Sequence, residues 1–143
     1  KRNKSNEILK LLASKGGILG LSLYPHHLKN NSNCTIDSFC TMIIDLIELI
    51  GVDHIGFGSD LCQDQPDSVV EWMRVGRWTK KIDYGEGSAS NSGFPKMPSW
   101  FKGNRDWKNI LNKLQELGLK QEEIDQIKGL NWYNFLIKTK AFK

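Results

Sequence analysis

Apolar positions along the chain follow two kinds of spacing, one typical of helices and one typical of strands. Leucine and isoleucine recur every three or four residues over 5–14, 36–49 and 107–117, and each segment is followed by a glycine. This spacing predicts three amphipathic helices that end near those glycines. Residues 18–23 form an almost continuous apolar run, and 54–59 form an apolar run interleaved with glycine, so both predict short strands.

The order of these elements predicts how the two strands pair. A strand, a helix and a second strand in succession form a right-handed crossover, which makes the strands parallel and adjacent. Two further helical segments, 121–127 and 130–137, follow toward the C-terminus. Two parallel strands with this many helices neither close a sheet nor cover its edges, so the α/β unit needs further strands as partners.

Residues 62–105 lack the regular spacing of the rest of the chain. Residues 69–77 predict a short helix, whereas 84–93 are rich in glycine, serine and asparagine. An irregular segment of this length is usually functional or disordered. Its aromatic and charged side chains favour a packed loop over an active-site mouth, and an irregular surface insertion is an equal alternative.

The composition excludes some classes of protein. Of the 143 residues, 39% are hydrophobic, which is enough for a core. Twenty Lys and Arg against 16 Asp and Glu give a net charge of +4, and these charges are scattered. The basic stretch 102–108 is therefore interpreted as a solvated face and not as a nucleic-acid site. No apolar run reaches the length of about 18 residues that indicates a transmembrane helix.

The three cysteines, Cys34, Cys40 and Cys62, are an odd number and lack the close pairwise spacing of zinc sites. They predict buried or half-buried free thiols, which suit a reducing compartment and therefore a cytoplasmic location. The chain begins at Lys1 without an initiator methionine, which favours a fragment of a longer protein.

Asp60 is the candidate catalytic residue. It directly follows the predicted strand over 54–59, and in barrels of alternating strands and helices the catalytic side chains lie where the strands end. The alternative is that Ser59 and Asp60 only begin a turn, because both residue types are favoured there for local hydrogen bonding. The pattern alone leaves both interpretations open.

The same segment also resembles the signature of a known family. Gly56-Phe57-Gly58-Ser59-Asp60-Leu61 is similar to the Gly-hydrophobic-Gly-Ser/Gly-Asp-Phe-Asp-Gly motif of the membrane (renal) dipeptidases, which are zinc metallopeptidases. Three more segments resemble that family in the same order along the chain: Lys1-Arg2-Asn3, the Gly-Gly-hydrophobic run over 16–24, and the Gly-x-Asn helix start at Gly129-Leu130-Asn131. Four collinear matches across almost the whole chain argue against coincidence.

The resemblance implies a fold and an activity. Residues 1–143 would be the C-terminal part of one (β/α)8 TIM-type barrel domain, holding its last two strands and terminal helices, with 62–105 as an insertion. The implied activity is that of a zinc-dependent dipeptidase, which hydrolyses dipeptide amide bonds with metal-activated water. The resemblance implies two Zn²⁺ ions, with their ligands upstream of this chain and none within it. The oligomeric state is left open, and a homodimer is one candidate.

The resemblance also implies roles for three residues. Asp60 matches the carboxylate that handles protons beside the metal-bound water. Arg2 matches the family's substrate-binding arginine, whose guanidinium suits a bidentate hold on a terminal carboxylate. Tyr24 follows the penultimate strand and is a candidate for contact with the substrate, although a tyrosine that only packs is the alternative.

The histidines are not expected to bind metal. His26 and His27 are adjacent, so on a strand they would point to opposite faces. His54 stands at the start of its strand, the end away from the expected active site.

Departures from the family pattern keep other functions open. Cys62 and Gln63 stand where the family has Asp and Gly, and Tyr133-Asn134 stands where it has Leu-Arg. One alternative is a catalytically inactive relative that serves as a binding module. Another is a different barrel amidohydrolase that acts on a small amide.

Overall fold

β1 (Leu19–Leu21) and β2 (Ile55–Phe57) are parallel neighbours in the computed structural model, which describes residues 3–73 and 93–141. Leu19 lies opposite Ile55, and Leu21 lies opposite Phe57. The predicted parallel pairing is confirmed. Each strand is shorter than predicted, because only three residues of each lie in the regular ladder.

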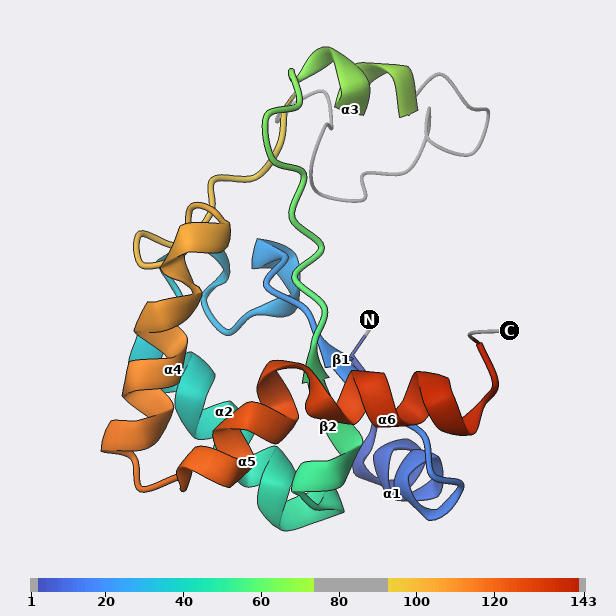
Figure 1. The fold of residues 1–143 in the computed structure, drawn as a ribbon. Helices are drawn as coiled ribbons and strands as arrows, with labels where there is room; N and C mark the ends of the chain where they lie inside the picture. The colour runs from blue at the N-terminus through green and yellow to red at the C-terminus, as the bar shows by residue number, and fades with distance from the viewer. Residues whose placement is uncertain (1–2, 74–92, 142–143) are drawn as a thin grey trace.

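Helices surround this small sheet (Figure 1). α4 packs on α2, α1 packs on α2 from another side, and α6 lies against β2. Within the described ranges, no helix is both long enough and apolar enough to cross a bilayer. The helices are α1 (Asn6–Ser14), α2 (Ile36–Ile50), α3 (Ser68–Met73), α4 (Trp107–Glu116), α5 (Gln121–Asp125) and α6 (Asn131–Lys138). Short 3-10 turns stand at Pro25–His27, Asn31–Asn33, Val52–His54 and Asn104–Asp106, and a π-helical turn at Gln126–Leu130 joins α5 to α6.

The ends of α2 explain why the chain turns back into β2. At its start, the Thr35 hydroxyl accepts a hydrogen bond from the Ser38 N–H at 3.1 Å, which satisfies a backbone donor that the helix leaves unpaired. At its end, Gly51 has a φ of 85°, a conformation that side chains disfavour. The chain therefore leaves the helix at Gly51 and enters β2 after one 3-10 turn.

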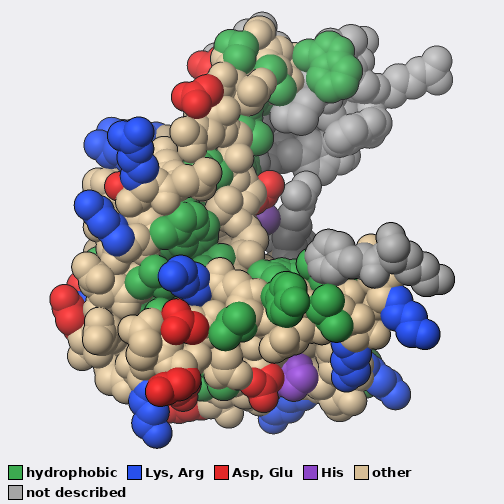
Figure 2. All heavy atoms as spheres, viewed as in Figure 1, with side chains coloured by type: hydrophobic (Ala, Val, Ile, Leu, Met, Phe, Trp, Pro, Cys, Tyr) green, Lys and Arg blue, Asp and Glu red, His purple; other side chains and the backbone are tan. Residues whose placement is uncertain are grey.

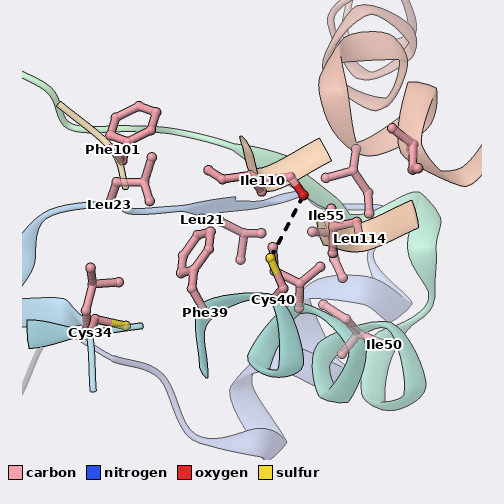
Figure 3. Close-up of a cluster of buried hydrophobic side chains, with 14 of the residues drawn as sticks. Leu21, Leu23, Cys34, Phe39, Cys40, Ile50, Ile55, Phe101, Ile110 and Leu114 are labelled. Atoms are coloured by element: carbon pink, nitrogen blue, oxygen red, sulfur yellow. Dashed lines mark hydrogen bonds between the residues drawn. The ribbon is translucent and has the colours of Figure 1, made fainter. Parts of the chain in front are cut away.

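The core lies between the sheet and the helices α2 and α4 (Figure 3). Leu21 and Ile55 from the strands meet Phe39 and Cys40 of α2 and Ile110 of α4, and all five side chains are buried. The Cys40 thiol faces the carbonyl oxygen of Ile110 at 3.9 Å. Full burial of a large aliphatic or aromatic side chain contributes roughly 1.5–3 kcal/mol, so this contact holds the sheet to α2 and α4.

One side of α6 and of the π-helical turn before it is apolar and exposed. Leu130, Tyr133 and Ile137 follow helical spacing and are each 50–58% exposed. Figure 2 shows apolar side chains along this side of the molecule. The described elements therefore leave this side of α6 uncovered.

The described parts of 62–105 contain α3 and the turn Asn104–Asp106. Phe101, near the end of this region, is fully buried in the core, so that end of the region is packed. The helix predicted over 69–77 is present over Ser68–Met73. Its remaining residues, and the irregular segment predicted over 84–93 apart from residue 93, lie outside the described residues.

The cysteines follow the prediction at two positions and depart from it at the third. Cys34 and Cys40 are buried, whereas Cys62 is exposed because it lies in the irregular segment that leaves β2. Burial raises the pKa of the Cys40 thiol from 9.0 to about 12, and burial also raises the pKa of Cys34. Neither buried thiol supplies thiolate at neutral pH.

Alkylation of the native protein with iodoacetamide should therefore be selective. We expect Cys62 to be modified first, and Cys40 to react about a thousandfold more slowly than an ordinary thiol at pH 8, because its higher pKa lowers the thiolate fraction by that factor. Mass spectrometry of peptides with and without denaturant measures this. Equal labelling of Cys62 and Cys40 in the native protein would contradict the fold at α2.

Candidate active site

Both strands end at the same edge of the sheet, here called the carboxyl edge (residues 22–24 and 58–60). Beyond the regular ladder, the Gly58 N–H donates to the Leu21 carbonyl oxygen at 3.0 Å, and the Leu23 N–H donates to the Ser59 carbonyl oxygen at 3.1 Å. Tyr24 directly follows Leu23, and Asp60 directly follows Ser59, the two residues that this last hydrogen bond joins. The tertiary structure therefore brings together two residues that the sequence analysis had selected separately.

Asp60 stands where the chain turns away from the sheet. Its φ of 55° is in the left-handed region, which Asp tolerates better than most residues. The turn itself uses Ser59, whose Oγ accepts a hydrogen bond from the Leu61 N–H at 3.4 Å. The Asp60 side chain is exposed, and its carboxylate has no hydrogen bond or ion pair with any described residue. Among the described residues the turn is thus held by Ser59 and not by the Asp60 carboxylate.

Tyr24 leads into the 3-10 turn Pro25–His27. Its ring meets the His27 ring edge-on, with 5.0 Å between the ring centroids. Ser22 Oγ holds this turn, since it accepts from the Tyr24 N–H at 3.1 Å and lies 3.0 Å from His27 Nδ1. The Tyr24 hydroxyl is buried and has no hydrogen-bond partner among the residues that the structure describes. Such a group is rare and calls for an explanation, for which a bound ligand is one candidate.

Arg2 lies outside the described residues, but its neighbour Asn3 is described. The Asn3 side-chain amide donates to the His27 carbonyl oxygen at 3.2 Å. This bond ties the first described residue of the chain to the turn that follows β1, 24 residues later.

The histidines lie differently from the sequence-based expectation. His26 and His27 are in the 3-10 turn Pro25–His27 and not on a strand, so the argument from opposite strand faces was wrong. Proline at the first position of this turn ends the extended conformation after β1. Over 3–73 and 93–141, no group of three or more His, Cys, Asp or Glu side chains is placed to hold a metal ion. This part of the chain therefore does not fit a metal site of its own.

Two residues of α6 to which the sequence analysis assigned no role hold β2 in place. Asn131 is buried, and its side-chain amide donates to the carbonyl oxygens of Val52 at 2.7 Å and Ile55 at 2.8 Å. Trp132 Nε1 donates to the Phe57 carbonyl oxygen at 3.0 Å. The indole also lies against Gly56, where an added Cβ would stand 2.7 Å from Trp132 Cδ1. The glycine inside β2 was the available signal, because a strand glycine often marks close approach by another group.

Asn131→Ala should destabilise the protein. It removes two hydrogen bonds and leaves two carbonyl groups at the start of β2 without their amide donor, so the free energy of unfolding should fall by about 1–3 kcal/mol. Asn134→Ala is the matched control, since Asn134 is exposed on the same helix and its loss should change stability by less than about 0.5 kcal/mol. Urea unfolding measures both. Equal effects of the two substitutions would show that Asn131 does not hold β2.

Comparison with known proteins identifies the family. The model of the membrane dipeptidase family, peptidase family M19, matches residues 1–81, which include β1, β2, Tyr24 and Asp60. The chain belongs to the membrane dipeptidase family. No protein of curated function matches it.

Two solved structures are similar to this membrane dipeptidase family member. An amidohydrolase from Pseudomonas aeruginosa has 28% sequence identity and a TM-score of 0.76, and the match covers 94% of this chain and 40% of that one. The dipeptidase AC, a metallopeptidase of family M19, has 16% identity and a TM-score of 0.66, and the match covers 94% of this chain and 32% of that one. The helix-rich fold with a small parallel sheet is thus shared with both proteins. The family and these neighbours are hydrolases, and the chain spans less than half the length of either neighbour.

Proposed function

We propose that this chain is the C-terminal part of a zinc-dependent dipeptidase of the membrane dipeptidase family, and that β1 and β2 are the last two strands of its (β/α)8 barrel. The family match, and the small share of each neighbour's length that the chain covers, support this proposal. Residues 1–143 would form one part of a single domain, with 62–105 as an insertion. The two zinc ions that the family resemblance implies would be held by residues outside this chain.

The observation that carries the proposal is the position of Asp60. It lies at the carboxyl edge, the side of a barrel that bears catalytic groups. Its carboxylate is exposed and bonded to no described residue. In the proposed reaction this carboxylate accepts a proton from the attacking water and then donates it to the leaving amine nitrogen as the amide C–N bond breaks.

Two other residues would bind the substrate. The Tyr24 hydroxyl is buried at the same edge without a hydrogen-bond partner in the described chain, so it would donate to a substrate oxygen. Arg2 would hold the terminal carboxylate of a dipeptide with its guanidinium. The bond from Asn3 to the turn after Tyr24 supports this role, because it anchors the residue next to Arg2 at the carboxyl edge.

A second candidate is an amidohydrolase that acts on a different small amide. The neighbour with the higher identity and TM-score is an amidohydrolase, which favours this alternative. A catalytically inactive binding module is the third, because Cys62 and Gln63 replace family residues beside Asp60. Activity on cyclic amides without activity on dipeptides would favour the second candidate, and no hydrolysis of either class would favour the third. A homodimer and a cytoplasmic location stay predictions.

In the full-length protein, Asp60→Asn should abolish most of the activity. The amide keeps the size of the side chain but cannot accept a proton, so kcat on dipeptides with Zn²⁺ present should fall by about 10²–10⁴-fold. Steady-state kinetics measure this. Asp64→Asn is the matched control, since Asp64 is an exposed carboxylate four residues away with a similar φ of 58°, and its rate should not change.

A role for Asp60 in the turn alone gives the opposite result. The substitution would then leave kcat close to that of the unaltered protein and cost at most about 1 kcal/mol of stability. That outcome would remove the basis of the proposed function.

Arg2→Ala and Tyr24→Phe should act mainly on substrate binding. We expect Arg2→Ala to raise KM for free dipeptides by about tenfold, the loss expected for a charge-assisted hydrogen bond, with little effect on dipeptides whose C-terminal carboxylate is amidated. Tyr24→Phe should raise KM for both kinds of substrate. Equal effects of Arg2→Ala on free and amidated dipeptides would contradict the carboxylate-binding role.

A further inference from the structure

A hollow of about 220 Å³ lies at the other edge of the sheet, where β1 and β2 begin. Its walls come from Ile18, which precedes β1, from Asp53 and His54, which precede β2, and from one face of α6. Five residues, 55–59, separate His54 from Asp60 and include β2, so at about 3.3 Å per residue the two positions are on the order of 15–20 Å apart along the chain. The hollow is therefore distinct from the carboxyl edge.

Two side chains of opposite charge line this hollow without pairing. Asp53 Oδ1 accepts a hydrogen bond from Gln126 Nε2 at 2.5 Å, and Oδ2 has no partner among the described residues. The Lys138 ammonium has no ion pair within the described ranges and lies 3.2 Å from the place where a Cβ on Gly16 would stand. Figure 2 shows acidic, basic and histidine side chains near one another below α6. Because the two charges do not neutralise each other, the space between them suits a ligand that carries both charges.

Neutral polar groups stand beside each charge. His54 Nδ1 donates to the Gly17 carbonyl oxygen at 2.8 Å, so Nε2 of the neutral ring is an acceptor, next to Asp53 along the chain. On the opposite wall, Asn134 lies one helical turn from Lys138 and also lines the hollow, so its amide can donate. An ammonium group would thus meet two acceptors, and a carboxylate would meet two donors.

Two apolar side chains also line the hollow, together with Gly16 and Asn131. These apolar side chains are Ile18 and Phe135. A volume of about 220 Å³ admits one small molecule and not a folded segment or a long peptide. An aliphatic side chain on the ligand would cover these two residues.

We propose that this hollow binds a free amino acid, with its ammonium group at Asp53 and His54 and its carboxylate at Lys138 and Asn134. A ligand with a single charge would leave either Asp53 or Lys138 unmatched, whereas a zwitterion matches both. This binding does not depend on the proposed function. If that function holds as well, the hollow receives the class of molecule that dipeptide hydrolysis releases, at a site remote from Asp60.

Titration of the full-length protein with L-leucine tests the proposal. The probe should shift the His54 ring signals in NMR spectra, assigned with His54→Gln, and saturate with a Kd of about 1–10 mM, as suits so small a ligand. N-acetyl-leucine lacks the ammonium group and leucinamide lacks the carboxylate. Each should bind about three- to tenfold more weakly, the contribution of one exposed charge pair.

Variants locate the site. Asp53→Asn and Lys138→Met should weaken leucine binding by a similar three- to tenfold, and Lys138→Arg should retain it. Asp45→Asn and Lys128→Met are matched controls, because both residues are exposed and line neither wall of the hollow. Lys138→Met should leave the hydrolysis rate without added amino acid unchanged.

Three results would overturn the proposal: no saturable shift at about 50 mM leucine, equal affinity for leucine and both analogues, or leucine binding that is lost in Asp60→Asn and kept in Lys138→Met. The last result would assign leucine to the carboxyl edge. Saturable leucine binding by a protein that hydrolyses no dipeptide would refute the proposed function alone, and dipeptide hydrolysis without leucine binding at Lys138 would refute this inference alone.

Discussion

Two parallel strands of three residues have too few backbone hydrogen bonds to be stable by themselves, and the rest of the structure depends on how this sheet is held. The buried contacts with α2 and α4 hold one face of the sheet. Asn131 bonds to the start of β2, and Trp132 bonds to its end and packs on Gly56. Asp60 follows β2 directly, so its position is set by a helix about 70 residues further along the chain.

The fold and the candidate chemistry use different side chains. Ser22, Ser59 and Asn3 satisfy backbone groups at the carboxyl edge and thereby shape the turns there. The Asp60 carboxylate and the Tyr24 hydroxyl lie on those turns but bond to no described residue. A buried hydroxyl without a partner costs about 1–3 kcal/mol, so Tyr24 is the stronger indication that something else completes this edge.

The sheet also bears on the proposal that the chain is part of a larger barrel. Within the described ranges β1 pairs only with β2, so each strand has one lateral side without a partner strand. Such a side exposes unpaired backbone groups. This chain spans 40% and 32% of its two structural neighbours, which is consistent with further strands beside β1 and β2. The two ends of the sheet differ in chemistry. The carboxyl edge presents Asp60, whereas the opposite edge presents the separate charges of Asp53 and Lys138.

Local periodicity and motifs in fixed order were enough to predict the helices, the two strands, their parallel order and the family. The sequence also selected Asp60, which directly follows its strand. The three-dimensional fold was needed to show that Tyr24 and Asp60 share one edge, that His26 and His27 lie on a turn, and that Cys62 is exposed. It alone assigned Asn131 its role, through bonds that span 76 and 79 residues. Contacts between residues so far apart in the sequence depend on how the helices pack, and the local spacing of residue types along the chain does not specify that packing.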